Sequence, residues 1–79
     1  MIKPSPFAIL GDPEEIARAE KATEIAWSYV EAGVPSADKE RQRMRLVYVV
    51  VSLAIERVDE PADLAHRAIH RFQERQRRR

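Results

Sequence analysis

The sequence predicts an all-α protein: a small three-helix bundle with helices over about residues 13–33, 37–58 and 61–76. Three observations favour it, namely two acidic helix starts that contain proline, apolar residues that recur every three to four positions, and the lack of a partner for any strand. A short extended N-terminal arm over 1–11 and a basic frayed tail over 75–79 complete a single helical domain. A chain of this length buries only about 60% of its unfolded surface, so association would add useful stability.

The first helix has clear start and stop signals. In "GDPEE", Asp12 can accept hydrogen bonds from the free amides of the first turn, and Pro13 suits the first helical position. Gly33 is expected to end the helix in a left-handed conformation, and Pro35 blocks its continuation. The apolar positions between these signals keep helical spacing: Ile16, Ala19, Ala22, Ile25, Ala26, Tyr29 and Val30.

The second segment is ambiguous on propensity alone. Ser36 offers a cap and "ADKERQRM" reads as helix, but the β-branched run in "LVYVVVSLAI" favours a strand. Helix is the better interpretation because a lone strand would have no partner in this chain. The apolar positions also keep helical spacing through both halves: Met44, Val47, Tyr48, Val51, Ala54, Ile55 and Val58.

The third helix begins as the first one does. In "DEPAD", Asp59 or Glu60 can cap the helix and Pro61 fits its first turn. A narrow apolar stripe follows, made of Leu64, Ala65, Ala68, Ile69 and Phe72. Because the loops are short, the three helices are expected to pack antiparallel in sequence order.

The middle helix carries more apolar surface than its neighbours can cover. Met44, Tyr48, Val51, Ile55 and Val58 fall on one side, and a second apolar set spreads over most of the remainder. The first helix presents mainly alanine and the third only a slim stripe, so a partner is expected to cover the second set. We therefore predict a homo-oligomer or a protein partner, with a contact made by Leu46, Val49, Val50 and Leu53 and anchored by Trp27.

A monomer is the alternative. The N-terminal arm contains Phe7, Ile9 and Leu10, which could fold back over the middle helix and cover its spare apolar side. The oligomeric mass of the protein distinguishes the two interpretations.

Charge is unevenly distributed, which suggests a second function. Residues 12–40 carry eight acids and three bases, whereas 41–79 carry ten bases and five acids. Arginines near the C-terminus could bind nucleic-acid phosphates: Arg67, Arg71, Arg75, Arg77, Arg78 and Arg79. This alternative, a small nucleic-acid-binding accessory protein, is less favoured, because the net charge is only +1 and no aromatic residues interleave the tail.

The sequence contains little that suggests catalysis. Two glycines cannot form a phosphate-cradling loop, and no serine is near a histidine in a nucleophile pattern. Asp63, His66 and His70 share one helix face with metal-ligand spacing, but such a group is more often solvated surface. We therefore expect no catalytic residues, no metal, no cofactor and no small-molecule substrate, and we predict a non-catalytic protein–protein interaction module.

The expected location is the cytoplasm. The ten-residue apolar run at 46–55 rises only about 15 Å as a helix, against a hydrocarbon core of about 30 Å, so no membrane span is expected. The apolar patch in "MIKPSPFAIL" is too short for a signal peptide. The absence of cysteine is compatible with a reducing compartment.

Overall fold

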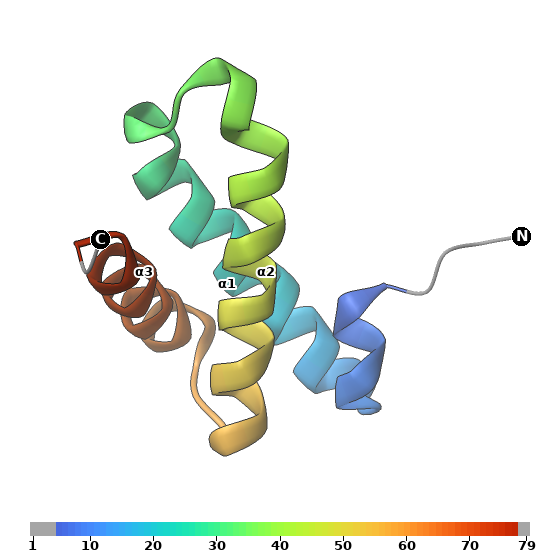
Figure 1. Ribbon diagram of the computed structural model, residues 1–79. Helices are drawn as coiled ribbons and strands as arrows, with labels where there is room; N and C mark the ends of the chain where they lie inside the picture. The colour runs from blue at the N-terminus through green and yellow to red at the C-terminus, as the bar shows by residue number, and fades with distance from the viewer. Residues whose placement is uncertain (1–4, 78–79) are drawn as a thin grey trace, which may run out of the picture.

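The computed structural model describes residues 5–77, and three α-helices make up most of this range (Figure 1). They are α1 (Pro13–Val30), α2 (Lys39–Glu56) and α3 (Pro61–Arg77). The predicted all-α three-helix bundle is confirmed. No residue in the described range is in a strand, so the β-branched run of the middle segment is helical. Tertiary packing against α1 and α3 outweighs the local preference of valine for extended backbone.

The start of α1 matches the prediction, whereas its end differs. The Oδ1 atom of Asp12 accepts a hydrogen bond of 2.9 Å from the backbone N–H of Glu14. The chain then tightens after Val30 into the 3-10 turn η2 (Glu31–Gly33), which closes with a 3.0 Å bond from the Val34 N–H to the Glu31 carbonyl. Gly33 therefore does not take the left-handed conformation expected of it. Among the described residues, positive φ occurs at Gly11, with φ 77°.

The helix α2 starts later and ends sooner than expected. The 3-10 turn η3 (Ser36–Asp38) comes before it, so Ser36 lies inside a turn and does not cap the helix. Asp38 occupies the cap position, but its carboxylate pairs with Arg41 at 2.8 Å. At the other end Arg57 is extended, with φ −164° and ψ 159°. The loop that follows leads into α3, whose first turn closes on the carbonyl of Glu60.

The N-terminal arm is not extended. Pro6–Leu10 form the 3-10 helix η1, and the Ser5 hydroxyl caps it by accepting from the Phe7 N–H at 3.2 Å. η1 packs against α1 and α2, with Phe7 and Leu10 partly buried against the core. Figure 1 shows η1 on the opposite side of α2 from α3. The alternative in which the arm folds back is therefore correct for Phe7 and Leu10, whereas Ile9 remains 71% exposed.

The core lies where the three α-helices meet. Three fully buried alanines, Ala19, Ala22 and Ala26, give α1 a flat face that lets the other helices approach closely. In Figure 1 α2 runs from top to bottom, whereas α3 is strongly foreshortened, so α3 crosses α2 steeply instead of lying antiparallel as expected. The other two helices supply the larger core side chains: Leu46, Val49, Val50, Leu53, Leu64 and Phe72.

Candidate functional site

The predicted interface residues of the middle helix belong to the core of a single chain. Leu46, Val49, Val50 and Leu53 are all buried, and Leu53 is only 2% exposed. In the folded chain these four side chains pack between the helices, so they form part of the core and no exposed patch. They fill the space between α1 and α3 because the alanine face of α1 leaves room for them. Trp27 is half-buried and packs against the same core.

The apolar surface of α2 that remains exposed is a stripe of Met44, Tyr48 and Ile55, which we call the α2 stripe. Their exposed fractions are 46%, 59% and 60%. The helical spacing of these three residues places them on one face of α2. The sequence pattern had assigned this side to the core, so the structure reverses the two sides of the helix.

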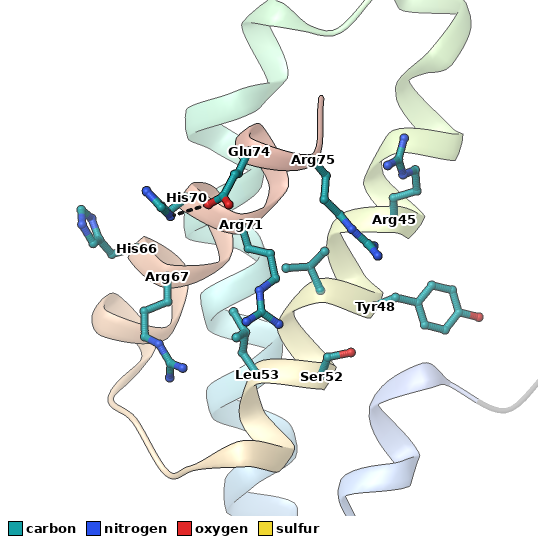
Figure 2. Close-up of a pocket in the computed structure, with 11 residues that line it drawn as sticks. Arg45, Tyr48, Ser52, Leu53, His66, Arg67, His70, Arg71, Glu74 and Arg75 are labelled. Carbon is teal, nitrogen blue, oxygen red and sulfur yellow. Dashed lines mark ion pairs between the residues drawn. The ribbon is translucent and has the colours of Figure 1, made fainter. Parts of the chain in front are cut away.

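A groove of about 820 Å³ lies between parts of α2 and α3. Four arginines line it: Arg45 from α2, and Arg67, Arg71 and Arg75 from α3. Val49 and Leu53 contribute apolar atoms to its lining, and Figure 2 shows Arg71 and Arg75 extending from α3 toward α2. We call this the α2–α3 groove.

Three of the predicted nucleic-acid contacts, Arg67, Arg71 and Arg75, therefore lie together in the α2–α3 groove. Sequence reasoning missed Arg45, because only the tertiary arrangement places it opposite α3. The other three predicted contacts cannot be assessed in the same way. The side chain of Arg77 lies outside the described residues, as do Arg78 and Arg79.

Ion pairs divide the groove arginines into two kinds. Arg67 binds the carboxylate of Asp59. The carboxylate of Glu56 lies 3.9 Å from a guanidinium nitrogen of Arg67 and 3.9 Å from one of Arg71. Glu74 is 3.5 Å from His70 (Figure 2). Arg45 and Arg75 have no ion-pair partner within the range that the structure describes. These two guanidinium groups are the groove cations most available to a ligand.

Asp59 ties the α2–α3 loop to α3. Its side chain is mostly covered, and it accepts hydrogen bonds from Arg67 and from the Nε of Arg57 at 3.2 Å. Burial opposes ionisation of this carboxyl, but the hydrogen bonds from Arg67 and Arg57 and their positive charge outweigh it. The pKa of Asp59 is therefore lowered from its ordinary value of 3.8.

We expect Asp59→Asn to lower the thermal midpoint at about pH 7 and to weaken its dependence on acid. Because the folded-state pKa lies below 3.8, the ionised carboxylate stabilises the fold above that pH, and the contribution is lost as the pH falls through the folded pKa. Midpoints measured from about pH 7 down to about pH 2 should therefore converge for the two proteins. Asp63→Asn, in an exposed position of α3, is the control. A constant difference between wild type and Asp59→Asn down to the lowest pH would contradict this assignment.

The described residues contain no grouping of histidine and carboxylate side chains suited to hold a metal ion. His66 and His70 point away from α2 in Figure 2. Two hydroxyl groups donate to backbone carbonyls within their own helix. These are Thr23, which donates to Ala19 at 2.8 Å, and Ser28, which donates to Ile25 at 2.9 Å.

None of the helices in the described part of the chain has the length and apolar character needed to cross a lipid bilayer. Comparison of the chain with known protein families, with curated proteins and with solved structures gave no match. The α2 stripe and the α2–α3 groove are the two features of the described surface that suggest a function.

Proposed function

We propose that this protein is a non-catalytic helical interaction module that self-associates through the α2 stripe. One observation carries the proposal: Met44, Tyr48 and Ile55 expose large apolar side chains along one face of a helix whose other apolar residues are already buried. Large apolar side chains that are exposed together on one helix face are typical of sites of protein association. Tyrosine and methionine are also enriched at such interfaces, because a phenol ring or a flexible thioether fills irregular contacts well.

An antiparallel pairing of two α2 helices fits this surface. Met44 and Ile55 lie near the two ends of the stripe, so a two-fold axis near its middle places Met44 of one copy beside Ile55 of the other. The same arrangement brings the arginine-rich first half of α2 toward the end that carries Glu56. A parallel arrangement would place the arginines of both copies together, which is unfavourable.

The association should be weak. Three side chains cover a stripe only about 16 Å long, which is short for a stable interface of standard size. We therefore expect a reversible homodimer with a dissociation constant in the micromolar range. Exchange of partners would then be fast, as suits a module that also meets other proteins. We place this module in the cytoplasm, in keeping with a sequence that has no cysteine.

Replacing Tyr48 with aspartate tests the proposal. At a protein concentration of a few hundred micromolar, light scattering should give a mass near that of a dimer for the wild type and near that of a monomer for Tyr48→Asp. The physical reason is that pairing would bury a carboxylate without a partner.

Tyr29→Asp is the matched control, because Tyr29 is the same residue type, is 68% exposed and belongs to α1. It should keep the wild-type mass. A wild type that stays strictly monomeric at this concentration would overturn the proposal, and so would equal loss of association in both variants.

A further inference from the structure

The arginines of the α2–α3 groove are spaced as a row. Arg67, Arg71 and Arg75 recur every four residues of α3, which separates their Cα atoms by about 6 Å along the helix. This separation is similar to that of successive phosphates along an extended nucleic-acid strand. Each guanidinium is planar and can bind a phosphate with two parallel N–H donors, a geometry that lysine lacks. Arg67 is held by Asp59, whereas Arg71 lies 3.9 Å from Glu56 and its side chain is 48% exposed, so Arg71 and Arg75 can meet two consecutive phosphates.

The opposite wall of the groove adds a further cation. Arg45 lines the groove from α2, and Arg75 extends across it from α3 (Figure 2). Neither has an ion-pair partner within the described residues, although Arg67 and Arg71 both have one. Two like charges that face one space repel each other, and an anion bound between them would relieve that repulsion. The groove thus has its strongest unmet positive charge at the end formed by Arg45 and Arg75.

We propose that the α2–α3 groove binds the phosphate backbone of a single-stranded nucleic acid. A strand matches the row better than a small anion does, because one phosphate would satisfy only the end at Arg45 and Arg75. Val49 and Leu53 line the groove but are almost fully buried, so the exposed ring of Tyr48 at its edge is the surface on which a base can stack. A duplex is too wide to enter a space between two packed helices and would touch only its rims.

The binding should not depend on nucleotide sequence. The groove supplies guanidinium groups to the backbone and apolar contact to the bases, and neither reads base edges. Contact with about two phosphates, one at Arg71 and one between Arg45 and Arg75, predicts that log K falls with log[salt] with a slope of about −1.4 for a single strand. This proposal does not rest on self-association, because it depends on the groove arginines, although Tyr48 of the α2 stripe also lines the groove.

The test is fluorescence anisotropy with a labelled oligothymidine of about 12 nucleotides at about 50 mM salt, where electrostatic binding is strong. The double variant Arg45→Gln/Arg75→Gln should bind about tenfold or more weakly than wild type, and its salt slope should shrink by about 0.7, because one phosphate contact is lost. The matched control is Lys21→Gln/Arg43→Gln, which removes the same charge from exposed positions outside the groove. It should bind within about twofold of wild type. Far-UV circular dichroism confirms that both variants stay folded.

Three results would overturn the proposal. Equal weakening in both double variants would mean that only net charge matters. Full binding by Arg45→Gln/Arg75→Gln, together with loss of binding in a chain that ends at Arg75, would assign the contact to the basic tail. Binding of polyglutamate as tightly as oligothymidine would indicate an acidic protein segment as the ligand. Inorganic polyphosphate serves as the competitor. If it displaces the oligonucleotide only at a higher concentration of phosphate groups than the oligonucleotide itself supplies, the proposal is supported, because the bases then contribute to binding.

Discussion

Leu53→Asp is expected to unfold the protein. Leu53 is 2% exposed and packs in the core shared by α1, α2 and α3. Removal of a buried leucine side chain alone costs about 2–5 kcal/mol, and a buried carboxylate without a partner adds several more. The sum is comparable with the total stability of about 5–15 kcal/mol typical of a domain, and a small domain lies toward the lower end of that range. Far-UV circular dichroism should show loss of helix at about 25 °C.

Ile55→Asp is the matched control for this experiment. Ile55 lies two residues further along the same helix, but it is 60% exposed in the α2 stripe. Aspartate there should leave the helix content unchanged and reduce the mass of the assembly, because the charge meets water in the monomer and an apolar partner in the dimer. If Leu53→Asp were instead a folded monomer, Leu53 would belong to an interface, and the assignment of the core would be wrong.

The sequence predicted the helices well because their signals are local. Asp12 and Pro13 begin α1, and Pro61 begins α3, through preferences that depend only on the first turn of a helix. The choice of helix for the valine-rich segment was also correct, since it used the period of a long pattern instead of the propensity of single residues. Helix ends were less predictable because 3-10 turns replaced the expected caps at Gly33 and Ser36.

The side of α2 that faces the core was not predictable in this way. Both sides are apolar, so periodicity alone cannot rank Leu53 above Ile55. The choice depends on where α3 crosses α2 and on the cover that η1 provides, and both are contacts between distant parts of the chain. The arm itself was hard to interpret because five residues are too few for a periodic signal.

Only the α3 side of the α2–α3 groove could be predicted from the sequence. The spacing of Arg67, Arg71 and Arg75 shows in the sequence that they share one face of a helix. Nothing local indicates that Arg45 lies opposite them, because it is far away along the chain and joins them only through the crossing of α2 and α3. Local pattern therefore gave the row of charges, and tertiary structure gave the site.

The double variant Phe7→Ala/Leu10→Ala is expected to lose about 2–4 kcal/mol of stability and about 10–20 °C in thermal midpoint. Both side chains are partly buried against the core and hold η1 on α2. Val47 and Val51 are buried although they lie outside the core cluster of the three helices, so we expect η1 to cover them and its truncation to uncover that flank of α2. Chemical denaturation followed by circular dichroism measures the loss directly.

Ile9→Ala is the control within the same segment, because Ile9 is 71% exposed and should change stability by less than about 0.5 kcal/mol. The double variant should also associate more strongly than wild type, since loosening η1 uncovers Val47 and Val51 beside Tyr48 and widens the apolar surface of the α2 stripe. A double variant as stable as wild type would show that η1 contributes no packing energy. An unchanged mass in a destabilised variant would show that the covered flank and the α2 stripe do not act as one surface.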